Sequence, residues 1–520
     1  MSQVAIEASR LSCDFASQTN SLFEDISLIL TDSTYFLIGR NGSGKSTLAA
    51  MLAQPSVEVK HFCRVGYLPQ GLDAFDGTVA QKLEVDQQLL ALKNIEQGSV
   101  DNHDFTLAEN NWDLPVVLEK QLTAYGLPSD ILAMPYSSLS GGERTRLSLL
   151  ALHRQGNDFN ILDEPSNHLD AKGRQWLLSW VKLHPACLII SHDTLLLHQS
   201  KVILELSGHG LKTYRGGWED YLSSKKVMEV SAERQVAQTE KDLKETKRSK
   251  QKSLEKLNAK SAQGSNKRVS SNQSKIILDK QKEKSEATGA RLATIAQQQL
   301  SSASQMHSEA KEALEIIKPQ AFIVGPVEEG KKKSLIVEQL CLPYCQQGPI
   351  SFNLPFGDHL WLRGDNGVGK STLFKILLGS VKPISGSIIS TTSIAMLDQH
   401  FSFLDENSSA ADNFERLSPG LPKDQYRTLL AQIRLRREAA LQPVKSLSGG
   451  ERLKLALSCI FSGGKSPALL LLDEPDNHLD LESKALLIGA LKQYQGSMII
   501  ISHDAEFVDG IGIQNQLTLN

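Results

Sequence analysis

Four short motifs occur twice in this chain, in the same order, and this repetition limits the fold more than any other feature. The repeated motifs are GRNGSGKST at 39–47 and GDNGVGKST at 364–372, LSGGER at 139–144 and 447–452, LDEPSNHLD at 162–170 and LDEPDNHLD at 472–480, and ISHD at 190–193 and 501–504. A chain of 520 residues is also too long for a single hydrophobic core. The sequence therefore predicts two copies of one domain.

The two copies differ in length. Gln70 and its counterpart Gln399 are 329 residues apart, whereas the two LSGGER motifs are 308 residues apart. We therefore expect about twenty additional residues in the first copy, in the polar stretch near 87–112. We place the first copy at residues 1–220, the second at 334–520, and a connecting segment at 221–333.

The connecting segment has its own composition. It is rich in Ala, Glu, Lys, Gln and Leu, which favour helices. A polar run at 261–274, which contains Gly264, predicts a turn. The segment is thus expected to form two long antiparallel helices, near 219–262 and 274–317.

Charge is distributed unevenly along the chain. The net charge is −3, but residues 221–320 contain 20 Lys and Arg against 12 Asp and Glu, so this segment carries +8 and the remainder −11. Such asymmetry indicates a nucleic-acid contact confined to the basic segment, although a solvated helical face has the same composition. The bases nearest the expected turn are Lys260, Lys267, Arg268 and Lys275.

The first repeated motif fits G-x-x-x-x-G-K-[ST], in which backbone N–H groups surround phosphate oxygens at the start of a helix. The lysine supplies charge to the β- and γ-phosphates, and the serine offers a hydroxyl to Mg²⁺. The predicted phosphate-binding residues are Gly39, Arg40, Asn41, Gly42, Ser43, Gly44, Lys45, Ser46 and Thr47 in the first copy, and Gly364, Asp365, Asn366, Gly367, Val368, Gly369, Lys370, Ser371 and Thr372 in the second.

Polar residues at the ends of strand-like runs complete a hydrolytic site. Each aspartate in LDEP is expected to hold Mg²⁺, and the glutamate after it to orient or deprotonate the attacking water. Gln70 and Gln399, which each follow another strand-like run, can reach the metal and the water. The histidine of ISHD can reach the γ-phosphate; a single such histidine is more often structural, but the repetition favours function. These residues are Asp163, Glu164, Gln70 and His192, and Asp473, Glu474, Gln399 and His503.

LSGGE predicts a helix start that binds an anion without a lysine of its own. Its residues are Ser140, Gly141 and Gly142, and Ser448, Gly449 and Gly450. In isolation the motif would be only a helix cap.

Together these motifs resemble the ATP-binding cassette (ABC) superfamily. The tandem copies, the NHLD after DEP and the long charged linker are similar to the ABC-F family of ribosome-associated ATPases. The resemblance implies an α/β fold, with two P-loop ABC-type nucleotide-binding domains joined by a long α-helical hairpin linker. It also implies a head-to-tail sandwich, in which Lys45 and Ser448 face one ATP, and Lys370 and Ser140 the other. Phe15 and Tyr344 would stack on the adenines.

The same resemblance implies a function. The chain would be a monomeric, Mg²⁺-dependent ATPase that closes on the ribosome with ATP, extends its linker towards the peptidyl-tRNA, and leaves after hydrolysis. The longest aliphatic runs fall far short of the roughly 18–20 residues of a membrane span, and the N-terminus has no signal pattern, so we expect a cytoplasmic protein. Housekeeping and antibiotic-resistance roles stay open.

Two other functions compete with this interpretation. The chain could be the ATPase subunit of a transporter with a separate membrane protein, although the basic linker argues against that. DNA repair proteins with similar domains carry much longer coiled coils or zinc modules.

Two residues also depart from the family pattern: Ser166 and Asp476 stand where threonine is usual. We expect two hydrolysis-competent sites, with the Asp476 charge slowing the second.

Overall fold

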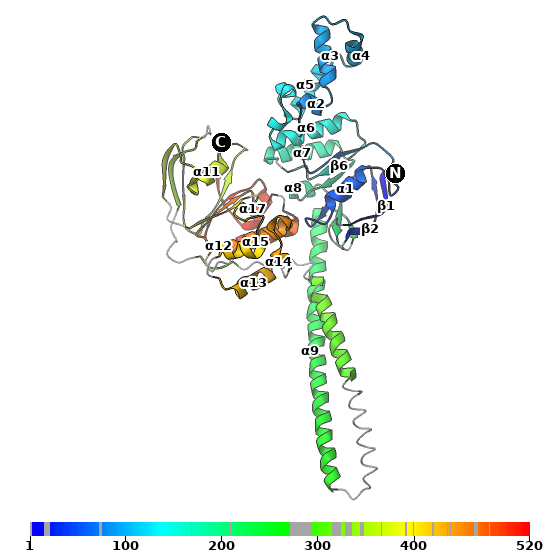
Figure 1. Cartoon of the computed structure of the whole chain (residues 1–520), viewed down its shortest axis with the longest axis vertical. Coiled ribbons are helices and arrows are strands. Elements are labelled where there is room, and N and C mark those ends of the chain that lie inside the picture. The colour runs from blue at the N-terminus through cyan, green and yellow to red at the C-terminus, as the bar shows by residue number, and fades with distance from the viewer. Residues whose placement is uncertain are drawn as a thin grey trace. The chain divides into compact units, whose positions relative to one another are not determined.

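The computed structural model describes residues 3–14, 21–71, 75–167, 169–208, 210–270, 291, 294–311, 313–314, 324–327, 335–343, 348–365, 367–389, 393–398, 400–418, 421–433, 435, 438–461, 466–477 and 479–519 (Figure 1). Within these ranges the side chains at 21, 254, 257–270, 432, 438 and 439 are not described. The chain forms two compact units. One comprises Met1–Asp220 with Ala321–Asn520, and the other comprises Tyr221–Gln320.

The first copy is built on a six-stranded sheet in the order β5-β6-β7-β3-β8-β9. These strands are β3 (Thr34–Gly39), β5 (Val65–Leu68), β6 (Phe159–Asp163), β7 (Cys187–Ile190), β8 (Val202–Ser207) and β9 (Gly210–Arg215). All neighbours are parallel except β9, which runs antiparallel to β8. The central strands are buried nearly throughout, as the continuous apolar runs of a parallel sheet require. Their carboxyl ends therefore meet at one edge.

Helices and a smaller sheet surround this core. The helices are α1 (Lys45–Ala53), α2 (Val79–Lys82), α5 (Leu114–Ala124), α6 (Gly141–Arg154), α7 (Ala171–Leu183) and α8 (Thr194–Leu197). The antiparallel sheet consists of β1 (Val4–Asp14), β2 (Ser21–Thr31) and β4 (Val59–His61), in the order β2-β1-β4. Leu48 and Leu52 of α1 are fully buried in the core that this sheet shares with β3 and β6.

The second copy repeats the plan. Its main sheet is β14 (Ile394–Asp398), β15 (Leu469–Asp473), β16 (Ser497–Ile501), β12 (His359–Arg363) and β17 (Asn515–Thr518), in this spatial order and all parallel. The smaller sheet is β11 (Ile350–Leu354), β10 (Leu335–Cys341) and β13 (Ser385–Ile389). The helices are α11 (Lys370–Leu377), α12 (Ala410–Leu417), α13 (Lys423–Gln432), α14 (Glu438–Leu441), α15 (Gly449–Phe461), α16 (Leu481–Gln493) and α17 (Ala505–Ile511).

The additional residues of the first copy form a pair of helices. Helices α3 (Asp86–Glu96) and α4 (Asn102–Ala108) pack together. The Asp104 carboxylate accepts hydrogen bonds from the Asn94 amide at 3.3 Å and from the Ser99 hydroxyl at 2.6 Å. These bonds tie both α3 and the loop between the helices to α4.

The linker unit contains a helix longer than the sequence predicts. Helix α9 (Trp218–Ser270) has 53 residues and a length of about 80 Å. The expectation of a turn from residue 261 was therefore wrong over 261–270, which are helical. Gly264 carries a helix penalty of only about 1 kcal/mol, too small to end a helix of this length. Of the four basic residues expected near the turn, Lys260, Lys267 and Arg268 lie in α9 with side chains that are not described, and Lys275 lies outside the described residues.

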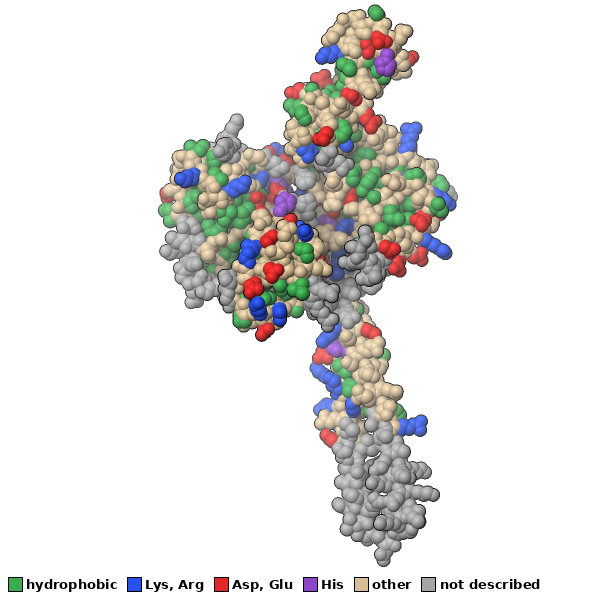
Figure 2. Space-filling view, viewed as in Figure 1, with side chains coloured by type: hydrophobic (Ala, Val, Ile, Leu, Met, Phe, Trp, Pro, Cys, Tyr) green, Lys and Arg blue, Asp and Glu red, His purple; other side chains and the backbone are tan. Residues whose placement is uncertain are grey.

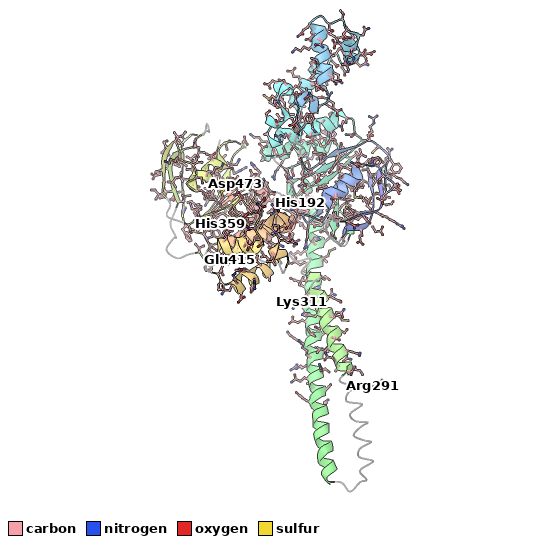
Figure 3. All side chains as sticks on the ribbon, in the orientation of Figure 1. His192, Arg291, Lys311, His359, Glu415 and Asp473 are labelled. Carbon is pink, nitrogen blue, oxygen red and sulfur yellow. The ribbon has the colours of Figure 1, made fainter. Side chains whose placement is uncertain are left out.

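A returning helical stretch at 294–311 runs beside α9. The Thr239 hydroxyl lies 3.2 Å from Nδ1 of His307, and the Lys250 ammonium donates to Gln297 at 2.5 Å. Thr239 precedes Lys250 while His307 follows Gln297, so the two helices are antiparallel. Figure 2 shows basic side chains along the described part of this unit, and Figure 3 labels Lys311 and Arg291 on its returning side. None of the described helices is long and apolar enough to cross a membrane.

Candidate active sites

The phosphate loops lie at the carboxyl-end edge of each parallel sheet, after β3 and after β12. Gly39 is held at φ +158°, and a Cβ there would lie 2.4 Å from the backbone oxygen of Leu206. Gly44 caps α1 in the left-handed region, at φ 90°. Gly364 and Gly369 repeat these conformations in the second copy. The glycines of the motif are therefore demanded by the backbone itself.

Each loop lysine is folded back over its own loop. The Lys45 ammonium donates to the carbonyl oxygens of Gly39 and Arg40 at 2.8 and 3.0 Å. Lys370 donates to Gly364 and Asp365 at 2.8 and 2.9 Å. Burial lowers the pKa of both lysines, and neighbouring carboxylates oppose that effect. A buried ammonium at the centre of a loop of glycines fits an anionic phosphate group.

The aspartates at the ends of β6 and β15 face the loop serines. Burial raises the pKa of Asp163, and the nearby Ser46 hydroxyl lowers it. Asp473 and Ser371 have the same relation. Both carboxylate oxygens of Asp163 are buried and lack a satisfactory hydrogen-bond partner among the described residues. No cluster of three acidic, histidine or cysteine ligands occurs in the described part of the chain. One carboxylate and one hydroxyl suit Mg²⁺, which takes its other ligands from phosphates and water.

The glutamate next to each aspartate has an unusual backbone. Glu164 has φ 50° and Glu474 has φ 49°, both in the left-handed region that non-glycine residues seldom adopt. The amide N–H of each glutamate donates at 2.9 Å to the last residue of the neighbouring strand, Ile190 or Ile501. Strain at equivalent positions in both copies marks these residues as functional candidates.

Each of these glutamates faces the ISHD histidine of its own copy. Nε2 of His192 lies 3.6 Å from Oε1 of Glu164, and the corresponding distance from His503 to Glu474 is 3.4 Å. The two pairs differ electrostatically. Burial raises the pKa of Glu164, whereas the neighbouring His503 lowers that of Glu474. The two sites are thus alike in geometry, but the pKa values of their glutamates shift in opposite directions.

Gln70 lines a small cavity with Asp163 and Glu164. Gln70 therefore lies beside the aspartate predicted to hold the metal and the glutamate predicted to orient the water. The remaining predicted residues Gln399, Asn366, Phe15 and Tyr344 lie outside the described part of the chain.

The LSGGE motifs begin α6 and α15. The Ser140 hydroxyl accepts from the amide of Glu143 at 3.3 Å, and the Glu143 carboxylate accepts from the Ser140 amide at 2.8 Å. Ser448 and Glu451 form the same capping box. This reciprocal bonding leaves the first helical amides, those of Gly141 and Gly142 or Gly449 and Gly450, at the free end of the helix.

Each phosphate loop contacts the other copy. The Asn41 amide N–H donates to Oδ2 of Asp480 at 2.7 Å. A Cβ on Gly449 would lie 3.6 Å from the Asn41 side chain, so the LSGGE helix of the second copy begins beside the first phosphate loop. In the opposite direction, Lys172 contacts Asp365 of the second loop at 2.8 Å. A phosphate loop therefore takes part in each of these contacts between the two copies.

Sequence reasoning missed several residues near these sites. Asp170 and Asp480 cap α7 and α16 through their side chains. Lys484 forms a buried ion pair with Asp504, and Arg174 lies 3.5 Å from Asp193 in the equivalent place. The final aspartate of NHLD just before a helical run was a detectable capping signal. The pairing of Lys484 with Asp504, and of Arg174 with Asp193, had no local signal in the sequence.

Fold and site define an ABC-type ATPase with two nucleotide-binding domains. A model of the ABC transporter family matches residues 23–167 and 348–477, which is more than half of the chain. The chain belongs to this superfamily and, within it, to the ABC-F family. It therefore binds ATP, and its domains are of the hydrolysing class.

The similar proteins support this assignment. YdiF of Bacillus subtilis is 30% identical over 91% of this chain and 74% of its own length. The mouse ATP-binding cassette sub-family F member 3 is 28% identical, with 91% and 66% covered. The energy-dependent translational throttle protein EttA of Mycobacterium tuberculosis is 31% identical, with 76% and 66% covered. This chain thus spans about two thirds to three quarters of these relatives.

Solved structures share the fold. The archaeal ribosome recycling factor aABCE1, in complex with the ribosomal stalk protein aP1, has a TM-score of 0.58 at 16% identity, covering 98% of this chain and 86% of the other. A structure described as RNase-L Inhibitor has a TM-score of 0.57 at 16% identity, with 96% and 86% covered.

Proposed function

We propose that this protein is a Mg²⁺-dependent ATPase that binds the ribosome in its ATP-bound, closed form and is released by hydrolysis. The observation that carries the proposal is the pairing of each phosphate loop with the opposite domain, joined to a basic helical linker. The throttle protein among the relatives and the recycling factor among the structures point to the ribosome as the partner.

The residues divide the chemical work. Lys45 and Lys370 neutralise the β- and γ-phosphates, and the loop amides hold their oxygens. Ser46 with Asp163, and Ser371 with Asp473, would hold Mg²⁺, assisted by Gln70 and Gln399. When bound, that ion would neutralise phosphate charge and help to position the γ-phosphate.

The acid–base step falls to the strained glutamates. Glu164 and Glu474 orient the attacking water and take its proton, with His192 and His503 hydrogen-bonded to the γ-phosphate. Ser140 and Ser448 complete the opposite face of each ATP. Closure of both sites then depends on both domains at once.

The linker supplies the RNA contact in this proposal. Lys260, Lys267, Arg268 and Lys275 would approach phosphates of the peptidyl-tRNA and ribosomal RNA, which requires charge but no base recognition. The protein would act in the cytoplasm as a monomer. A transporter subunit is the alternative if the ribosome fails as a partner.

The test is ribosome co-sedimentation of the double variant Glu164→Gln, Glu474→Gln with and without ATP. This variant should bind ATP, stay closed and pellet with ribosomes only when ATP is present. Its matched control is Lys45→Ala, Lys370→Ala, which should stay in the supernatant in either condition. If the double variant binds ATP yet does not pellet at low salt, the ribosome assignment is wrong.

Neutralising the four linker bases in the same background tests their role. Each lost phosphate contact should weaken ATP-dependent pelleting and reduce its salt dependence. Unchanged pelleting over a salt series would remove the linker tip from the contact.

A further inference from the structure

An ion pair of unusual position joins the first phosphate loop to the second domain. Nε of Arg40 lies 2.5 Å from Oε2 of Glu482, and a second guanidinium nitrogen donates to Oε1 at 3.1 Å. The side chains are 48% and 26% exposed, so the pair lies at the rim of the interface. Its two parallel contacts give it the geometric specificity of a bidentate pair.

The opposite interface has a pair in the equivalent place. The Lys172 ammonium lies 2.8 Å from Oδ2 of Asp365. The hydrogen bond to Asp365 raises the pKa of Lys172, and Lys172 in turn lowers the pKa of Asp365. Both groups are therefore held in their charged forms.

The two ion pairs occupy equivalent positions in the repeat, but the acid and the base have exchanged places. Arg40 and Asp365 each follow the first glycine of a phosphate loop. Lys172 and Glu482 are each the second residue of a helix, α7 or α16, capped by the aspartate of NHLD. One copy thus carries a base at both positions, and the other an acid at both.

From this exchange we propose that these four residues determine which domains pair, favouring first with second and opposing like with like. If two first domains from different chains paired in the same geometry, Arg40 would face Lys172. If two second domains paired, Asp365 would face Glu482. Like charges in direct contact oppose such assemblies.

A third contact has the same character. Nε2 of His198 lies 2.7 Å from Oε1 of Glu506 across the domains. The residue equivalent to His198 in the second copy is Asp509, six residues after its histidine, as His198 is six after His192. A pair of second domains would therefore also place Glu506 opposite Asp509. Domains of one fold share one interface shape, so charge is the property that can tell them apart.

The test exchanges the two helix residues in the full-length protein, as Lys172→Glu with Glu482→Lys. Net charge is unchanged, but each domain then carries one acid and one base, so like pairing becomes complementary and first-with-second pairing repulsive. Oligomeric state is measured by analytical ultracentrifugation with a non-hydrolysable ATP analogue, in the presence of Mg²⁺. A surface ion pair changes an equilibrium constant by up to about fivefold. In two exchanged chains, four contacts are repulsive when first and second domains pair and attractive when like domains pair. We therefore expect dimerisation at least about tenfold tighter than for the native chain.

Two controls separate this cause from others. Lys182→Glu with Glu415→Lys makes the same charge exchange on the exposed end of α7 and on α12 (Glu415 is labelled in Figure 3), and should leave the protein monomeric. Adding Arg40→Glu and Asp365→Lys to the exchange restores complementarity between unlike domains and should reverse dimerisation. If the exchanged variant folds, binds the analogue and stays as monomeric as the native chain, the proposal is wrong. Dimerisation that persists in the fourfold variant would overturn it as well.

Discussion

One buried residue near the hydrolytic sites differs in charge between the two copies. Ser166 of the first copy lies 3.3 Å from the Ser191 hydroxyl, whereas Asp476 of the second accepts a hydrogen bond from Ser502 at 3.0 Å. Asp476 is buried, and this burial raises its pKa to about 6. Lys484 and Arg174 favour its charge, while Asp504 opposes it. The second site thus contains a carboxylate whose ionisation costs folding energy.

Replacing Asp476 with asparagine should stabilise the protein at neutral pH. The unfolded carboxyl ionises near pH 3.8 and the folded one near 6, so the native stability falls as pH rises between these values and is level above them. Asp476→Asn removes this loss, with an expected gain of up to about 3 kcal/mol above pH 6.5 and only about 0.6 kcal/mol at pH 4. Urea unfolding at pH 4 and pH 8 measures it, with Ser166→Asn as a control in the first copy. Equal effects of Asp476→Asn at both pH values would contradict the argument.

The two catalytic glutamates should contribute unequally to basal turnover. Glu474 is held ionised by His503, whereas burial favours the neutral form of Glu164. We expect this difference between the glutamates to outweigh the slowing expected from the Asp476 charge, so Glu474→Gln should remove more than half of the ATPase rate at pH 7, and Glu164→Gln less than half. Loss of both should lower the rate by at least about 100-fold. Steady-state phosphate release measures all three, and the opposite order of the single variants would refute the inequality.

At the scale of elements, the sequence predicted what short motifs encode and missed what depends on tertiary contacts. The phosphate loops, the helix starts at Ser140 and Ser448 and the strand ends at Asp163 and Asp473 each have a local signal of glycine, cap or apolar run. The left-handed backbone of Glu164 has none, because its amide bonds to Ile190 on another strand. The end of α9 was misplaced because weak helix breakers do not stop a long helix.

Two glycines of the first phosphate loop should respond very differently to alanine. A Cβ on Gly39 would lie 2.4 Å from the Leu206 backbone oxygen, whereas at Gly42, with φ +81°, no atom lies within 4 Å among the described residues. Gly42→Ala should therefore lower the free energy of unfolding by only about 1 kcal/mol, the cost of a left-handed backbone at a residue with a side chain. Gly39→Ala must move β8 or the loop, and it should lower the free energy of unfolding by about 3 kcal/mol. Urea unfolding of the two variants compares them, and equal losses would show that the loop yields to the added methyl group.

At the scale of the whole molecule, one aspartate joins the folding of a helix to the pairing of domains. Oδ1 of Asp480 accepts from the Ser483 amide at 2.8 Å and so caps α16. Its other oxygen accepts from the Asn41 amide of the first phosphate loop at 2.7 Å. The cap needs only a short polar side chain, whereas the contact across the domains needs the full reach and charge of a carboxylate.

Asp480→Ser should therefore separate these two roles. Serine keeps the cap but cannot reach Asn41, so we expect little change in unfolding free energy and about a tenfold or greater loss of ATP affinity at the first site, the scale of a lost bond to a charged group. Titration with a fluorescent ATP analogue measures the affinity in the Lys370→Ala background, which silences the second site. Asp480→Asn, which keeps the reach without the charge, should fall between serine and the native residue. If serine binds as tightly as the native protein, closure of the first site does not depend on this contact; if serine unfolds the second domain, the cap was the larger of the two roles.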